Sequence, residues 1–295
     1  MVPDAGGSKP PRVFALGLQR LGDIAVWPGL YAVGVAGLLL WCVGASRSDF
    51  GWRDLLPLAV FVFLCSQGGY LLDRAKISGK RLDPADETAN SARFHVFAVH
   101  GGLIRRVVAI EFAAAALVGI FIEPWLAIVP IGTSVGVMIY AGRPAEVGKP
   151  RPKDLLVLKA GFIATAHLAL ACAAVMVLAG FEAILSINVV TAVTGVWLIV
   201  LGDAVVCDFD DIEADRAFGT LTLPVVFGEN AAWALALVCH LGAAVLILEV
   251  RGIAPAVGIA CLLVASMVMA MMLPRRKDYI DARLLCVALI CLANS

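Results

Sequence analysis

A cluster of acidic side chains lies at residues 208–215, which read DFDDIEAD. At about 100° of helical rotation per residue, Asp208, Asp211 and Asp215 share one face, whereas Asp210 and Glu213 point elsewhere. Three carboxylates on one face repel each other unless a cation lies between them. Hard oxygen ligands suit Mg²⁺, which keeps several waters and bridges readily to phosphate groups. The spacing therefore favours a Mg²⁺ and diphosphate site, and the alternative is a solvated acidic loop.

The chain that carries this cluster is strongly apolar. Hydrophobic residues make up 61% of it, the mean hydropathy is +0.92, and only 16% of residues are charged, against about 25% in soluble domains. An Asp at the centre of a membrane helix costs roughly 2.5–3.5 kcal/mol. The cluster must therefore lie at a helix end, in a water-filled cavity or against a cation. The composition predicts a polytopic membrane protein embedded in the lipid bilayer.

Apolar runs long enough to form helices recur along the chain and must position the acidic cluster. They lie at about residues 24–45, 55–72, 107–122, 125–140, 155–180, 183–206, 231–248, 253–273 and 284–293. Spanning the hydrocarbon takes about 20 helical residues, so the last run is either a tilted half-helix or a short span. We expect an all-α fold of about nine transmembrane helices. Residues 1–23 are expected to form a cytoplasmic tail with a short interfacial helix, and residues 24–295 a single transmembrane domain.

The basic residues predict the orientation. Most of the 23 Lys and Arg residues fall in segments that a nine-pass topology places on the same side as the N-terminus. Since positive loops stay in the cytoplasm, we expect the N-terminus, the acidic cluster and every other candidate catalytic loop to be cytoplasmic.

Composition also argues against some functions. The chain has equal numbers of basic and acidic residues and a pI near 6.9, and it has no basic stripe with interleaved aromatic residues, so we expect no nucleic acid partner. The 8 cysteines are scattered through apolar runs without a C-x-x-C pair. They are expected to be small core residues rather than a metal or redox site.

The acidic cluster continues into a longer motif, DFDDIEADRAFGTLTLPVVFG at residues 208–228. This stretch resembles the second aspartate-rich motif of the UbiA superfamily of intramembrane prenyltransferases, in which D-x-x-D-x-x-x-D runs into D-R-x-x-G and T-L-P-V-x-x-G. The matching residues are Asp208, Asp211, Asp215, Arg216, Gly219, Thr222, Leu223, Pro224, Val225 and Gly228. The resemblance implies a bundle of helices around a central cavity.

The first aspartate motif of that superfamily corresponds to QGGYLLDRAKISGKRLD here. Asp73 matches a metal ligand, and Ile77 stands where the last Asp of the motif belongs. The Y-x-x-D-R start resembles bacterial branches of the superfamily. The resemblance thus implies that Asp73 holds metal opposite the second motif, that Arg74 binds diphosphate, and that the protein lies in a bacterial inner membrane.

A third match covers the end of the fourth apolar run and the start of the fifth. Tyr140 and Lys159 match a Tyr and a Lys of the superfamily, and Arg143 belongs to the basic loop between them. The resemblance implies that these three side chains contact the diphosphate. Arg143 has an alternative role as a positive-inside anchor. Lys159 lies inside an apolar run, where a cation needs a partner or must snorkel to the interface.

By resemblance, the expected function is Mg²⁺-dependent transfer of an isoprenyl group from a prenyl diphosphate to a lipophilic or aromatic acceptor. Its catalytic residues would be Asp73, Lys159, Asp208, Asp211 and Asp215. Three alternatives stay open: a terpene cyclase of the same superfamily, a transporter that uses intramembrane charges, and a non-catalytic member. The sequence identifies neither the acceptor nor the prenyl chain length.

Overall fold

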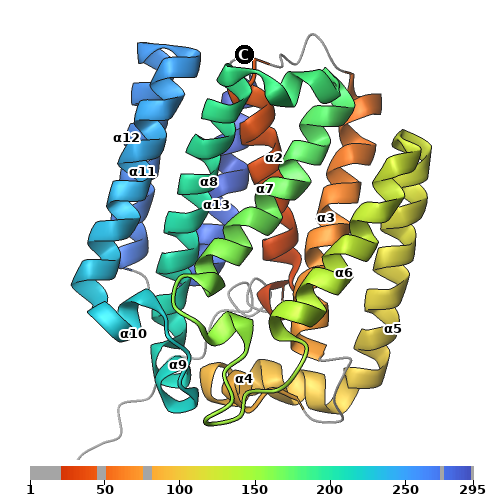
Figure 1. The fold of residues 1–295 in the computed structure, drawn as a ribbon, viewed down its shortest axis with the longest axis vertical. Coiled ribbons are helices and arrows are strands. Elements are labelled where there is room, and N and C mark those ends of the chain that lie inside the picture. The colour runs from red at the N-terminus through yellow and green to blue at the C-terminus, as the bar shows by residue number, and fades with distance from the viewer. Residues whose placement is uncertain (1–20, 45–50, 76–81, 273–275, 294–295) are drawn as a thin grey trace, which may run out of the picture.

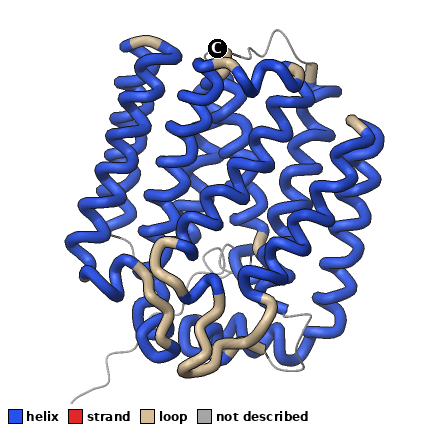
Figure 2. Tube along the Cα trace, viewed as in Figure 1, coloured by secondary structure: helices blue, strands red, loops and turns tan. Residues whose placement is uncertain are grey.

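A computed structural model describes residues 21–44, 51–75, 82–272 and 276–293. All regular structure in these ranges is helical, which confirms the predicted all-α class (Figure 2). Ile77 and most of the predicted tail and interfacial helix at residues 1–23 lie outside the described residues.

The long helices stand side by side, and the short ones gather at one end of the bundle (Figure 1). The long helices are α2 (Val26–Cys42), α3 (Trp52–Ala75), α5 (Ser91–Ile122), α6 (Ile128–Ala141), α7 (Leu158–Ala179), α8 (Ile187–Cys207), α11 (Glu229–Arg251), α12 (Ile253–Met271) and α13 (Arg276–Ala293). The short helices are α4 (Pro84–Ala89), α9 (Ile212–Phe218) and α10 (Leu223–Phe227). The 3₁₀ turns are η1 (Pro124–Ala127), η2 (Pro152–Asp154), η3 (Phe181–Leu185) and η4 (Asp208–Asp211).

Within the described residues, 6 helical segments are long and apolar enough to cross a membrane, and α2 is a shorter apolar helix. These segments make the chain a multi-pass membrane protein. The predicted number of nine crossings stays a prediction, because α5 and α13 carry charged residues and are not among the 6.

Two helix starts differ from those predicted. Helix α5 begins at Ser91, well before the apolar run predicted at residues 107–122, because the Asn90 side chain accepts a hydrogen bond from the Arg93 amide at 3.0 Å. Helix α13 likewise begins at Arg276, well before the last apolar run at residue 284. In both helices the apolar pattern marks only part of the element, since polar residues form its first turns.

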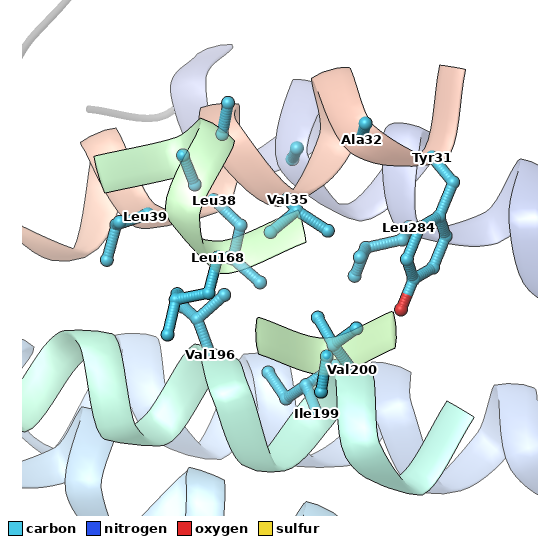
Figure 3. Close-up of a cluster of buried hydrophobic side chains, with 14 of the residues drawn as sticks. Tyr31, Ala32, Val35, Leu38, Leu39, Leu168, Val196, Ile199, Val200 and Leu284 are labelled. Atoms are coloured by element: carbon cyan, nitrogen blue, oxygen red, sulfur yellow. The ribbon is translucent and has the colours of Figure 1, made fainter. Parts of the chain in front are cut away.

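Helix α2 is central and packs against α3, α7, α8 and α13. Figure 3 shows Val35, Leu38 and Leu39 of α2 gathered with Leu168 of α7 and Val196 and Val200 of α8. The contact between α2 and α13 depends on Gly34. A Cβ atom on Gly34 would lie 2.7 Å from the backbone nitrogen of Leu285. In membranes, small residues of this kind let helix backbones approach closely, so Gly34 sets the position of α13.

Candidate active site

A cavity of about 690 Å³ lies within the bundle. One part is charged and is lined by Asp73, Lys159, Asp208, Asp211, Asp215 and Lys277. The rest is mainly apolar and follows α7 from Phe162 as far as Met176. Since an α-helix rises 1.5 Å per residue, the cavity extends along α7 for about 25 Å from Lys159. The cavity thus joins a polar end to a long apolar channel.

The three carboxylates predicted to share one face do converge, and the Lys159 ammonium lies between them. Its Nζ atom is 3.0 Å from Asp208 Oδ1, 2.9 Å from Asp215 Oδ2 and 3.8 Å from Asp211 Oδ2. The chain here is not one continuous α-helix, because η4 carries Asp208 and Asp211 and α9 carries Asp215. The predicted grouping of the three carboxylates is therefore correct, and Lys159 has the partners that its place in an apolar helix requires.

Lys277 is a second cation at this site and was not predicted. It lies in the first turn of α13, where its ammonium pairs with Asp211 and its backbone amide donates to Asp210 Oδ2 at 3.0 Å. In the sequence Lys277 is one of several basic residues in a loop-like stretch, PRRKDYIDAR. Nothing in that pattern separates it from its neighbours, since only the position of α13 brings it to the carboxylates.

The donor set fits a hard divalent cation in its chemistry. In the described part of the chain, no three His, Cys, Asp or Glu side chains form a ready metal site. The Lys159 ammonium lies where the carboxylates converge. Asp208 and Asp215 are buried, and Asp73 lines the same cavity from α3. Carboxylate oxygens are the ligands that Mg²⁺ prefers. A metal ion could bind here if the Lys159 side chain moved off the carboxylates.

Asp73 and Arg74 both line the polar end of the cavity from the end of α3. Asp73 Oδ1 accepts a hydrogen bond from Lys153 Nζ at 3.3 Å, and Arg74 pairs with Asp86 of α4. The structure therefore brings both predicted residues to the cavity, each with a partner of opposite charge.

Tyr140 lines the cavity, but Arg143 does not. The Tyr140 ring stacks on Phe162 with centroids 4.2 Å apart, and its hydroxyl donates to the backbone oxygen of Lys159 at 3.5 Å. Arg143 is exposed, and its guanidinium donates to the backbone oxygens of Lys149 and Pro150. The structure therefore does not bring Arg143 to the cavity with the other candidate residues, because its side chain is bonded within its own loop, and its contact with diphosphate stays a prediction.

A buried set of polar bonds holds together the loops at the polar end. Arg151 pairs with Asp83 and with Asp154, and Asp154 Oδ1 accepts from Thr220 Oγ1 at 2.8 Å. Burial acts to raise the pKa of Asp154, but hydrogen bonds from Arg151 and Thr220 and the charge of Arg151 hold that pKa below its ordinary value. These bonds join the loop before α7 to the start of α4 and to the turn after α9. The sequence pattern did not single out Arg151 among the basic residues of this loop.

A second polar cluster lies within the bundle, away from the acidic motif. Asp203 of α8 pairs with Arg283 of α13, and its Oδ1 lies 3.1 Å from His240 Nε2 of α11. Its other oxygen accepts from the Tyr31 hydroxyl of α2 at 3.0 Å. All four side chains are buried. Asp203 therefore does not extend the acidic cluster but ties together four helices.

Comparisons with known proteins connect this geometry to solved structures. No protein-family model matches the sequence, and no curated protein does. A UbiA homologue from Aeropyrum pernix K1 superposes with a TM-score of 0.64 at 19% identity, covering 91% of this chain and 96% of that one. A UbiA homologue from Archaeoglobus fulgidus gives 0.59 at 11% identity, covering 94% and 98%. A digeranylgeranylglyceryl phosphate synthase gives 0.53 at 16% identity, covering 92% and 96%.

These likenesses cover nearly the whole chain, so they concern the complete bundle rather than a shared helical hairpin. They confirm the fold that the acidic motif led us to expect: a helical bundle enclosing one large cavity. The chain therefore has the fold of the UbiA homologues.

Proposed function

We propose that this chain is a prenyltransferase of the UbiA superfamily, which transfers an isoprenyl group from a prenyl diphosphate to a lipophilic or aromatic acceptor within the membrane. The observation that carries this proposal is the cavity, in which paired carboxylates and ammonium groups open directly into a long apolar channel. A prenyl diphosphate has the same division, with an anionic head and an apolar tail.

The head group would bind at the polar end. Asp208, Asp211 and Asp215, with Asp73 from α3, are the residues that would hold Mg²⁺. When bound, Mg²⁺ neutralises the diphosphate and stabilises it as a leaving group. The polar end already contains both charge signs, so a metal ion and a diphosphate held there would not be buried unpaired.

Besides any metal ion, the protein itself supplies positive charge at the polar end through Lys159, Lys277 and Arg74. On donor binding their N–H groups exchange carboxylate partners for phosphate oxygens, and they stabilise the negative charge that develops on the departing diphosphate. The Tyr140 hydroxyl, which donates to the Lys159 backbone, supports the turn from which Lys159 projects. Arg143 takes no part in this proposal.

The apolar channel would hold the isoprenyl tail. Its length of about 25 Å along α7 suits an extended chain, and its walls exclude water from the reacting carbon. The aromatic rings of Tyr70 and Phe162 line the cavity, and aromatic faces stabilise a nearby cation. These features favour ionisation of the donor at its allylic carbon inside the protein, followed by capture of that carbon by the acceptor.

We further propose that the protein resides in a bacterial inner membrane with the polar end facing the cytoplasm. The basic residues of the loops around the cavity mouth support this orientation under the positive-inside rule.

The test is diphosphate release by the purified protein in detergent. Geranyl, farnesyl and geranylgeranyl diphosphates are supplied with Mg²⁺, with and without a pool of aromatic acceptors. Mg²⁺-dependent release that needs an acceptor supports a transferase, whereas release without acceptor indicates a cyclase. No release by protein shown to be folded would overturn the proposal.

Two substitutions sharpen this assay. Asp211→Ala should abolish release, because it removes a carboxylate of the converging set. Glu213→Ala is the matched control, since Glu213 belongs to the same acidic stretch but is exposed. Equal loss in both variants would show that the acidic stretch acts only through its total charge.

A further inference from the structure

The apolar part of the cavity follows one face of α7. Lining residues recur on this helix every three or four positions, as Phe162, Ala166, Ala169, Ala173 and Met176. Residues with this spacing share one face of a helix. Met176 follows Phe162 by 14 residues, so the helix advances about 21 Å between them. The channel therefore has a wall of defined length on this side.

Helix α6 supplies a second wall of similar length. The Tyr140 ring stacks on Phe162 with centroids 4.2 Å apart, so the two helices share one level at the polar end. From Tyr140, lining residues continue back along α6 and η1 to Trp125. Twelve residues of α-helix and three of 3₁₀-helix separate Trp125 from Tyr140, which is about 24 Å. Trp125 and Met176 thus lie at similar distances from the stacked rings, on two separate helices.

The length of an isoprenyl chain can be compared with these walls. An extended peptide advances about 3.3–3.6 Å over three backbone bonds, so the four chain bonds of one isoprenyl unit advance about 4.5–5 Å. Four units therefore cover about 18–20 Å. An extended tail that starts at the Tyr140 and Phe162 rings and follows α7 ends near the level of Met176 after four units.

Ala169 lies halfway along this path. It follows Phe162 by about 10 Å, which is the extended length of two isoprenyl units. Ala169 is exposed and lines the cavity. Its neighbours on the helix surface, Thr165, Ala166, Ala173 and Met176, line the cavity as well. Ala169 therefore belongs to the lining face, and its single methyl group leaves space at this level.

We infer that the donor carries four isoprenyl units, as in geranylgeranyl diphosphate, and that Ala169 is a specificity-determining residue for this chain length. The inference rests on the proposed function and adds the size of the donor. The third and fourth units pass the methyl group of Ala169 and reach the lining residues Ala173 and Met176. A larger side chain at position 169 closes this path to the third unit and leaves room for the first two.

A binding experiment tests the chain length without turnover. Unreactive S-thiolodiphosphates with geranyl, farnesyl and geranylgeranyl chains are titrated into the purified protein in detergent with Mg²⁺. Each dissociation constant is divided by the wild-type value for the same compound, so that partition into micelles cancels. Ala169→Phe should weaken geranylgeranyl binding about tenfold or more, because overpacking a filled site has a cost of that order. Geranyl binding should stay unchanged.

Ala109→Phe is the matched control for this titration. Ala109 is exposed on α5 and is not among the described residues that line the cavity, so binding of all three compounds should stay unchanged. Unchanged geranylgeranyl binding in Ala169→Phe, or equal weakening of all three compounds in a folded variant, overturns the inference.

A photo-crosslinking experiment on the wild-type protein tests the same inference even if Ala169→Phe fails to fold. A geranylgeranyl S-thiolodiphosphate with a diazirine on its fourth unit is bound and irradiated, and the labelled residues are identified by mass spectrometry. Labelling of Trp125, Ala173 or Met176 supports the inference. Labelling confined to the polar end, or to detergent, overturns it.

These measurements also separate the inference from the proposed function. Wild-type protein that binds none of the three compounds would overturn both. Protein that is labelled at Trp125, Ala173 or Met176 but releases no diphosphate from the reactive donors would retain the site for a four-unit tail and overturn the transfer reaction.

Discussion

Substituting Lys159 by Met should have opposite effects on stability and on metal binding. In the structure the Lys159 ammonium lies within 3.0 Å of two carboxylates, and its side chain is only 16% exposed. Met retains the apolar stem and removes the charge. Asp211 keeps Lys277 as its partner, whereas Asp208 and Asp215 lose the cation between them.

The size of the loss follows from burial. Removing one partner of a buried ion pair costs about 3–5 kcal/mol, and here one ammonium serves two carboxylates that are themselves 6% and 9% exposed. Without divalent cations, the free energy of unfolding should therefore fall by at least about 3 kcal/mol. In the variant, Mg²⁺ no longer competes with an ammonium for the same oxygens. Mg²⁺ at a concentration 100-fold above its Kd for the variant would raise the free energy of unfolding by about 2.7 kcal/mol.

The assay is thermal unfolding in detergent, with EDTA and with a titration of Mg²⁺. Lys149→Met is the matched control, because the Lys149 side chain is 66% exposed and pairs with the exposed Glu146, so its loss should cost less than about 1 kcal/mol. Donor binding to Lys159→Met should weaken about tenfold or more, since a charge-assisted hydrogen bond contributes about 1.5–3 kcal/mol. Equal stability of the two variants in EDTA, or equal stabilisation by Mg²⁺ in wild type and Lys159→Met, would refute the reasoning.

Three further predictions concern stability in detergent. Gly202→Val should lower the free energy of unfolding by about 1–3 kcal/mol, because a Cβ there would lie 2.7 Å from the His240 ring; unchanged thermal unfolding would contradict this packing. Asp203→Asn should cost about 3–5 kcal/mol by leaving the buried Arg283 without its carboxylate, and a loss below that of an exposed control would argue against the ion pair. The lowered pKa of Asp154 means that its carboxylate stabilises the fold above its ordinary pKa of 3.8 and that this contribution disappears as the pH falls through the lower folded value. Asp154→Asn should thus be less stable at neutral pH and less sensitive to acid, and parallel pH profiles would disprove this assignment.

The sequence predicted the acidic half of the site because the relevant residues are close in the chain. Asp208, Asp211 and Asp215 share a face through local geometry alone, and that face survives the change from η4 to α9. Lys159 could be singled out because a cation inside an apolar run must find a partner. In both cases short-range regularity was enough to identify the group.

The basic half was harder to predict because it depends on how distant helices pack. Lys277 is 66 residues from Asp211, and no local pattern marks it. Arg143 and Arg151 look alike in a basic loop, yet Arg151 is buried between two carboxylates whereas Arg143 is exposed. Only tertiary contacts decide which basic side chain enters the cavity.

The placement of α13 has a consequence for how the protein is made. Arg283 lies 80 residues after Asp203, its partner in α8, so during synthesis Asp203 enters the bilayer well before its counter-ion exists. Tyr31 and His240 precede α13 in the chain and can bond this carboxylate, but its Arg283 partner arrives only when α13 docks against α2 and α8. Part of the roughly 2.5–3.5 kcal/mol cost of an intramembrane carboxylate is therefore relieved at that step. The same event brings Lys277 to Asp211. Docking of α13 therefore supplies the buried Asp203 with its counter-ion and completes the charged end of the cavity in a single late step of synthesis.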